Sequence, residues 1–244
     1  MLKKIFRRIW RILKALIKAP FWYGRDFFRY RAMLKRENVR TPFYILPLVF
    51  DRDPKAHTFD KHYVYMDRWA FKLLQNSRPI SHVDIGSSIR FLSMASTVAH
   101  TTFVDIRPVK PDFDNFEVTE GSILAMPYPD NFLKSLSCLH VAEHIGLGRY
   151  GDPLNPLGTQ KACLELARIL APGGKLYFAL PVGKSVTYFN AHRVHSPKTI
   201  LEYFSGLKLL SFSAVGDDGR YYENVQWQNY EQAWYVCGMF EFTK

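Results

Sequence analysis

The sequence predicts an α/β fold built around a mostly parallel sheet, and three observations lead to it. Short apolar and β-branched runs alternate with runs whose apolar residues recur at helical spacing. The run Ile80–Ile85 leads through a single glycine, Gly86, into a helical pattern over residues 89–95. The last two apolar runs, 207–215 and 233–243, have no helical pattern between them. We expect these two runs to pair antiparallel at one edge of the sheet.

Residues 1–40 are expected to form a basic amphipathic segment at a membrane surface. Residues 2–18 predict a helix with an apolar face and a basic face, and Pro20 is expected to end it. No apolar run here approaches the ~20 residues of a membrane span, so this helix would lie on a bilayer. The basic face comprises Lys3, Lys4, Arg7, Arg8, Arg11, Lys14 and Lys18, and the aromatic and arginine residues of 21–31 suit a headgroup layer.

The distribution of charge points to the same partner. The net charge is +11, and residues 1–40 hold 13 Lys or Arg against two acidic residues, so the other 20 basic and 20 acidic residues cancel. A nucleic-acid enzyme would carry basic surface around its site, so we expect an anionic membrane surface as partner and no nucleic acid. The alternative is that the helix packs on the domain or on a protein partner.

The three cysteines are never in C-x-x-C spacing, which indicates a reducing compartment and no structural zinc. We therefore expect a peripheral protein on the cytoplasmic face of the membrane. Residues 41–58, with three prolines, predict a linker, and residues 59–244 predict one domain. That domain begins with a helical pattern from Phe59 to Leu74.

The remaining elements follow in alternation. Apolar runs predict strands at 101–105, 116–119, 135–140 and 175–180. A helical pattern over 162–170 precedes the last of these strands, and Pro172-Gly173-Gly174 is expected to end that helix.

A cofactor with a ribose is predicted at the first strand end. Asp105 follows Asp84 by 21 positions, about the distance at which an acidic residue binds ribose hydroxyls in dinucleotide folds. Only Gly86 is present where a dinucleotide fold has several glycines, so a cofactor without a pyrophosphate fits better. The alternative is an ordinary βαβ unit in which Asp105 caps a turn.

Four motifs resemble, in order and spacing, the class I S-adenosylmethionine-dependent methyltransferases, whose fold is a Rossmann-like sheet. They are Val83-Asp84-Ile85-Gly86, Val104-Asp105-Ile106, Gly121-Ser122-Ile123 before Met126-Pro127-Tyr128-Pro129-Asp130, and Leu170-Ala171-Pro172-Gly173-Gly174-Lys175-Leu176. Within that superfamily, residues 143–153 (EHIGLGRYGDP) and 190–193 (NAHR) resemble a domain family of unknown function. The resemblance covers residues 60–244.

The resemblance implies S-adenosylmethionine as cofactor and assigns residues to it. Asp84 and Gly86 would lie beside the methionine part, Asp105 on the ribose hydroxyls, and Ser122 and Ile123 beside the adenine, with His140 flanking the cofactor. Ser87 and Ile106 are also assigned to the cofactor. The sequence departs from the superfamily in its single glycine and in Ser122, where an aspartate often stands. A catalytically degenerate fold acting as a binding or scaffold module is therefore an alternative.

The acceptor is expected to be a small molecule or glycan, with O-methylation of a glycan or lipid-linked sugar during polysaccharide biosynthesis favoured. A sugar hydroxyl needs a general base, and the candidates are His140, Glu143, His144, His192 and His195. We favour His144 or His192, with Glu143 beside them, although a Glu-His pair after a strand can also simply fix a loop. The expected acceptor-binding residues are Arg149, Tyr150, Asp152, Asn190 and Arg193.

A zinc-dependent hydrolase is a remote alternative. His140, Glu143 and His144 fit the H-x-x-E-H signature of inverted zinc peptidases. That signature needs both histidines on one face of a helix, whereas the preceding residues here predict a strand. No metal site is expected.

Overall fold

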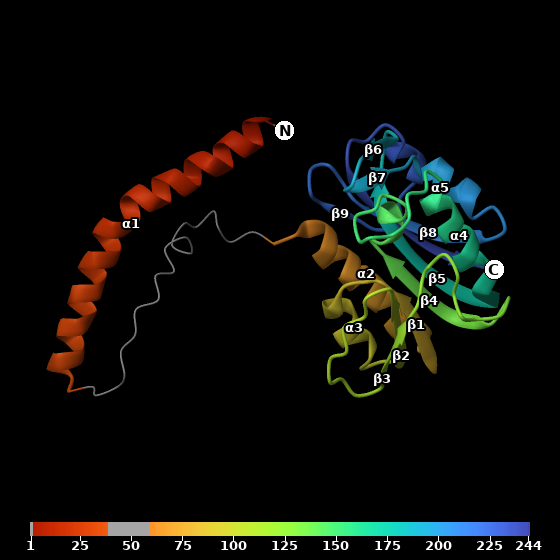
Figure 1. Ribbon diagram of the computed structural model, residues 1–244, viewed down its shortest axis with the longest axis horizontal. Helices are drawn as coiled ribbons and strands as arrows, with labels where there is room; N and C mark the ends of the chain where they lie inside the picture. Colours follow the sequence, from red (N-terminus) through yellow and green to blue (C-terminus); the bar gives the residue numbers. More distant parts are fainter. Residues whose placement is uncertain (1, 39–58) are drawn as a thin grey trace. The chain divides into compact units, whose positions relative to one another are not determined.

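The computed structural model describes residues 2–38 and 59–244, without the side chains of residues 2–9 and 11–19. The chain divides into two compact units, Met1–Phe59 and Asp60–Lys244, which are described separately (Figure 1). The linker expected over 41–58 lies outside the described residues.

The first unit contains one long helix, α1 (Leu2–Arg36). The expectation that Pro20 ends the helix is wrong, because α1 continues through it. A proline removes one backbone hydrogen bond and costs about 3 kcal/mol in a helix interior, a cost that the remaining hydrogen bonds of a 35-residue helix offset. Phe21 and Phe28 are largely exposed, at 79% and 69%. Among the described helices, none combines the length and apolar character needed to cross a membrane.

The second unit is built on an eight-stranded sheet of order β3-β2-β1-β4-β5-β10-β8-β9. The strands from β3 to β5 pair in parallel, and β10, β8 and β9 are added antiparallel. The predicted fold and the predicted antiparallel pair are thus confirmed. The strands are β1 (Ser81–Ile85), β2 (His100–Asp105), β3 (Phe116–Glu120), β4 (Leu133–Leu139), β5 (Leu170–Val182), β8 (Lys208–Val215), β9 (Tyr221–Tyr222) and β10 (Val236–Thr243).

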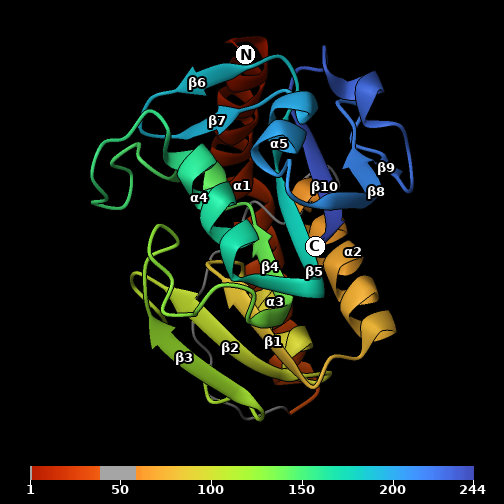
Figure 2. The ribbon, with the colours of Figure 1, turned by 90° about the vertical axis from the view of Figure 1, so that its right-hand side faces the viewer.

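Helices cover both faces of this sheet (Figures 1 and 2). On one face, α2 (Lys61–Ser77) and α3 (Ile89–Ala95) bury Trp69 and Phe91 against the strands. On the other face, α4 (Gly158–Ile169) and α5 (Pro197–Tyr203) bury Leu166 and Ile200. Because strand side chains alternate between faces, neighbouring residues of one strand contribute to opposite cores.

Side-chain caps fix where the two helices nearest the first strand begin. The Asp60 carboxylate accepts the backbone N–H of Tyr63 at the start of α2, and the Ser88 hydroxyl accepts that of Phe91 at the start of α3. The predicted helix over 59–74 and the predicted strand, glycine turn and helix over 80–95 are therefore confirmed.

The expected end of the helix before β5 is wrong. α4 ends at Ile169 and β5 starts at once, with Pro172-Gly173-Gly174 inside the strand range. The register with β4 jumps from Leu133↔Leu170 to Ser135↔Lys175, so these residues form a bulge.

Several short elements have no clear sequence signal. They are the hairpin β6 (Val186–Tyr188) and β7 (His192–Val194), the strand β9, and the 3₁₀ helices η2 (Ala142–His144) and η3 (Trp227–Tyr230). The helix α5 was also not predicted, although Ser196 and Pro197 are a helix start signal.

Candidate functional site

The site lies where the direction of strand connection reverses, between β1 and β4. From β1 the chain builds the sheet outward through β2 and β3, and then returns to place β4 on the other side of β1. Ligands of open parallel sheets bind at the carboxyl ends of the strands at such a point. Gly86 follows β1 and His140 follows β4, and both have a left-handed backbone, with φ of +66° and +57°. Each strand therefore ends in a sharp turn that opens a space above the sheet.

Two adjoining cavities occupy this space. We call the cavity of about 520 Å³ the first cavity and that of about 810 Å³ the second cavity. Gly86, His140, His144 and Tyr150 line both. These four residues mark the junction at which groups bound in the two cavities would meet.

The second cavity gathers most of the residues predicted to bind a cofactor: Gly86, Asp105, Ile106, Ser122, Ile123 and His140. Asp105 ends β2, and its Oδ1 accepts the Arg107 backbone N–H at 2.7 Å. A Cβ on Gly86 would lie 3.0 Å from Val141 and 3.4 Å from Asp105 Oδ2. Glycine at this turn therefore permits the left-handed backbone angle and also leaves free space beside the Asp105 carboxylate.

Ser87 and Asp84 shape the glycine turn. Ser87 lines the first cavity, donates its N–H to Asp84 Oδ1 at 3.0 Å, and accepts the Leu139 N–H with its hydroxyl. Asp84 is fully buried and lines neither cavity. Burial raises the pKa of Asp84 to about 6, against the opposing hydrogen bonds from Ser137 and Ser87. The Asp84 carboxylate therefore holds the backbone of the turn through Ser87 without lining either cavity.

Asp84 belongs to a chain of buried, hydrogen-bonded side chains on β1 and β4. Ser137 donates its hydroxyl to Asp84 Oδ2. His82 contacts Ser137 Oγ with Nε2 and Ser135 Oγ with Nδ1, each at 2.8 Å. Burial lowers the pKa of His82 to about 3, so its ring is neutral. The hydrogen bonds are consistent when Nε2–H donates to Ser137 and Nδ1 accepts from Ser135.

In the first cavity, Glu143 lies between two histidines. Its carboxylate is 1% exposed, and Oε1 lies 2.7 Å from His140 Nδ1 and 3.7 Å from His144 Nε2. Burial alone would raise the pKa of Glu143, but the His140 contact outweighs it and holds the pKa below its ordinary value. Burial would likewise lower the pKa of His140, while Cys237 and Glu143 raise it well above the usual range.

His144 is fixed at the junction by the opposite loop. Its Nδ1 lies 2.6 Å from the Ala191 carbonyl oxygen, to which Arg149 also donates at 3.1 Å. Nδ1 therefore carries a proton, and Nε2 is the nitrogen on the Glu143 side. The pair of Glu143 and His144 thus fixes the loop and also places a ring between the two cavities.

His192 lines the first cavity from the start of β7. Its ring lies 5.1 Å from that of Tyr188 and 5.2 Å from that of Tyr235, between ring centroids. Partial burial lowers its pKa, so His192 is neutral at pH 7.

The residues expected to bind the acceptor separate into two groups. Arg149 and Tyr150 line the first cavity, and Tyr150 and Asp152 line the second. Asp152 also accepts the backbone N–H groups of Gly146 and Tyr150. Asn190 is exposed, and neither Asn190 nor Arg193 lines the first or the second cavity.

Arg193 instead ties the hairpin to the loop that carries His144. It is 6% exposed and donates to the Ile145 carbonyl at 2.6 Å and the Asn155 carbonyl at 3.0 Å. Two backbone segments far apart in sequence are thereby held together.

Several lining residues were missed by the sequence analysis. Asp60, His62, Tyr63, Ser88 and Tyr235 line the first cavity, and Arg107 and Val109 line the second. Ser88 and Arg107 lie in the turns that follow β1 and β2, whose ends the sequence did predict. Their place in these turns could have indicated that they line the site. The α2 residues and Tyr235 had no such signal.

The zinc-peptidase alternative is contradicted by the backbone. β4 ends at Leu139, His140 has a left-handed φ, and only residues 142–144 form a 3₁₀ helix. The helix that would place His140 and His144 side by side is therefore absent from this described stretch.

One family model matches part of the chain. A family model described as "Caenorhabditis protein of unknown function, DUF268" matches residues 125–232, which include both long motifs. No curated protein sequence matched the chain.

Among solved structures, a putative sarcosine dimethylglycine methyltransferase from Galdieria sulphuraria is 14% identical, with a TM-score of 0.54 over 74% of this chain and 86% of that chain. The N-methyltransferase NodS from Bradyrhizobium japonicum, in complex with S-adenosyl-L-homocysteine, is 14% identical, with a TM-score of 0.53 over 87% and 97%. The [4+2]-cyclase SpnF is 13% identical, with a TM-score of 0.53 over 73% and 80%. The cyclase shows that this fold does not fix one reaction. The chain has the fold of the class I S-adenosylmethionine-dependent methyltransferases.

Proposed function

We propose that the protein is an S-adenosylmethionine-dependent methyltransferase that binds its cofactor in the second cavity. The observation that carries this proposal is the placement of Gly86, Asp105 and Ser122 around one cavity at the carboxyl ends of β1 and β2 and after β3. NodS, which has the same fold, was crystallised with S-adenosyl-L-homocysteine.

The residues present fit such a cofactor. Asp105 offers a carboxylate to two vicinal ribose hydroxyls, and its Oδ1 is already oriented by the Arg107 N–H. Ile123 is buried and Ser122 half-buried, so they offer an apolar wall and a hydroxyl to an adenine ring. The missing Cβ of Gly86 leaves room beside Asp105. When bound, the cofactor supplies an electrophilic methyl group on a sulfonium.

We place the acceptor in the first cavity. Arg149, Tyr150 and His192 line it together with His144, which suits a molecule rich in hydroxyl groups or carrying an anionic group. We assign the acceptor to glycans or lipid-linked sugars methylated on oxygen at a membrane surface. The basic segment of residues 1–40 supports that location.

His144 is the proposed general base, because it lines both cavities. The acceptor hydroxyl would form a bond to the methyl carbon as the carbon–sulfur bond breaks, leaving a neutral thioether. His144 Nε2 would take the hydroxyl proton. Glu143, 3.7 Å from that nitrogen, would stabilise the resulting imidazolium.

Methyl transfer from labelled S-adenosylmethionine tests the proposal. The full chain should label a lipid-linked glycan fraction. His144→Asn should lower the rate by roughly 10²–10⁴-fold, the usual contribution of a general base. Affinity for S-adenosylhomocysteine should not change, since the amide of an asparagine side chain can still donate to the Ala191 carbonyl. The control is His100→Asn. His100 is exposed and starts β2, whereas Asp105, which lines the second cavity, ends that strand.

Two results would contradict parts of this account. Labelling of proteins or small metabolites, with none of the glycan fraction, would overturn the acceptor assignment. Tight cofactor binding with no transfer to any fraction would favour a binding or scaffold module with the same fold.

A further inference from the structure

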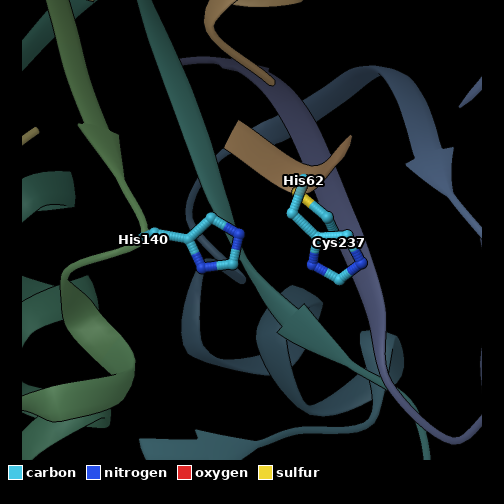
Figure 3. Close-up of side chains that lie close together, drawn as sticks. All are labelled: His62, His140 and Cys237. Carbon is cyan, nitrogen blue, oxygen red and sulfur yellow. The ribbon is translucent and has the colours of Figure 1, made fainter. Parts of the chain in front are cut away.

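Three side chains from separate elements meet beside the first cavity: His62 of α2, His140 after β4 and Cys237 of β10 (Figure 3). One potential ligand atom from each lies within 4.8 Å of the other two. None of the three residues lies near another in sequence, so their meeting is a product of the fold.

His140 presents a poorly satisfied nitrogen to the cluster. Its Nδ1 lies 2.7 Å from the Glu143 carboxylate, which leaves Nε2 to face the cluster. His140 is 8% exposed, and its buried Nε2 has no oxygen or nitrogen partner at hydrogen-bond distance among the described residues, while the Cys237 thiol lies beside it. A thiol is a weak hydrogen-bonding group, so a metal ion between these two side chains would satisfy the buried nitrogen better.

The Glu143 contact is the arrangement that orients metal-binding histidines. Such histidines donate their other ring N–H to a carboxylate, which fixes the ring and increases the basicity of the ligating nitrogen. Glu143 is 1% exposed, and its Oε2 has no partner among the described residues either. A metal ion bound at Nε2 would replace the proton of His140 in balancing this buried negative charge.

We infer that His62, His140 and Cys237 bind a divalent transition metal ion, for which Zn²⁺ is the probe. A thiolate and two imidazoles suit Zn²⁺ and disfavour Mg²⁺ and Ca²⁺, which take oxygen ligands. Binding displaces the Cys237 thiol proton and any proton on His140 Nε2, and both leave to solvent.

The geometry requires a small adjustment. Zn–N bonds of about 2.0–2.1 Å and Zn–S bonds of about 2.3 Å put tetrahedral ligand atoms roughly 3.3–3.7 Å apart. His140 and Cys237 are buried, whereas His62 is half-buried in the first turn of α2. Of the three side chains, that of His62 therefore has the most freedom to move toward a bound ion.

The fourth coordination position faces the first cavity. His62 and His140 line that cavity, while Cys237 is fully buried behind them. Three protein ligands with one open position are typical of zinc sites at which water or a substrate oxygen binds. The inference concerns ion binding and stands whether or not methyl transfer occurs.

Elemental analysis and Zn²⁺ titration of the metal-stripped full chain test the site. The wild type should take up one zinc ion per chain. His62→Gln and Cys237→Ser should each abolish stoichiometric uptake, and Glu143→Gln should weaken it by roughly 10–100-fold. Cys163→Ser is the matched control, because Cys163 is an equally buried free cysteine outside the cluster.

Co²⁺ gives a second readout. The Co²⁺-loaded wild type should show a thiolate-to-cobalt absorption band that is lost in Cys237→Ser and kept in Cys163→Ser. His62→Gln guards against misfolding of Cys237→Ser, because His62 is only half-buried whereas Cys237 is fully buried. Wild-type affinity no higher than that of His62→Gln, or a thiolate band that survives in Cys237→Ser, would overturn the inference.

Discussion

Asp84 holds the turn after β1 from inside the protein. Its two oxygens accept hydrogen bonds from the Ser87 N–H and the Ser137 hydroxyl, and no part of the residue is exposed. A buried carboxylate is costly in its charged form, and two hydrogen bonds recover only part of that cost. The folded protein therefore retains the Asp84 proton to a higher pH than the unfolded chain does.

This difference predicts a pH-dependent stability. Burial raises the pKa of Asp84 from 3.8 to about 6, so its contribution is fully present below pH 4 and is lost as the pH rises to about 6. Two units of pKa correspond to roughly 3 kcal/mol. The unfolding free energy of the wild type minus that of Asp84→Asn should fall by about this amount between about pH 4 and 7. Denaturant unfolding at several pH values measures the difference, and a value independent of pH would contradict this description of Asp84.

The sequence could predict site residues that directly follow strands. Asp105 and Gly86 stand at strand ends that the apolar pattern marks, and both line the second cavity. The sequence could not distinguish a residue that lines a cavity from a buried residue that supports the turn, so it predicted Asp84 beside the cofactor. Tyr63 and Tyr235 reach the first cavity by tertiary packing alone.

At the scale of elements, the loop between η2 and α4 is held by close backbone approaches. A Cβ on Gly158 would lie 2.0 Å from the Ile145 carbonyl oxygen, and one on Gly146 would lie 2.2 Å from that of Asn155. Arg193 clamps the same two carbonyl groups. The long glycine-rich motif thus positions His144, which lies at the start of the loop.

Gly158→Ala should consequently disrupt this loop. The added methyl group would overlap the Ile145 backbone, and overpacking of this kind costs roughly 1–3 kcal/mol of unfolding free energy. Methyl transfer should fall more than cofactor binding does, because the loop carries His144. Thermal unfolding and transfer rates measure both effects.

The control is Gly206→Ala, since a Cβ there meets nothing within 4 Å. Equal stability of the two variants would mean that the loop is not packed as described.

Long elements were predictable and their irregularities were not. The strands from β1 to β4 and the helix α2 follow apolar periodicity, which depends on neighbouring residues alone. Pro20 and Pro172 were both expected to end helices, yet one lies within α1 and the other within a bulge of β5. Helix continuation and bulges depend on the balance with surrounding structure, which a proline by itself does not reveal.

At the scale of the whole molecule, the net charge lies in the N-terminal segment, and the α/β sheet is formed by the remainder of the chain. Residues 1–40 carry the net charge of +11, and the rest of the chain is neutral overall. Each basic residue near an anionic leaflet contributes about 1 kcal/mol of binding free energy, and salt screens it.

The full chain should therefore co-sediment with anionic vesicles, and less so at high salt. Removing residues 1–40 should leave a folded domain that stays in the supernatant, because Asp60–Lys244 is a compact unit. Replacing Arg7, Arg8 and Arg11 by Glu should release most of the protein.

A charge-matched control replaces the exposed Lys110, Lys134 and Lys198 of the second unit by Glu. This variant should still sediment. Equal sedimentation of the full and truncated chains would show that α1 serves the domain or a protein partner.

The sheet architecture could be predicted as a whole because strands and helices alternate along the chain. The cluster of His62, His140 and Cys237 could not. Cysteine spacing detects sites built from one segment, whereas this cluster draws on α2, the turn after β4, and β10.

Calorimetric titration with S-adenosylhomocysteine measures whether the second cavity binds the cofactor. The wild type should bind, and Asp105→Asn should lose roughly 1.5–3 kcal/mol of binding free energy, or about 10- to 150-fold in affinity. The exposed Asp114→Asn should bind as the wild type does. Failure of the wild type to bind, or equal affinity in Asp105→Asn, would contradict the assignment of the second cavity to this cofactor.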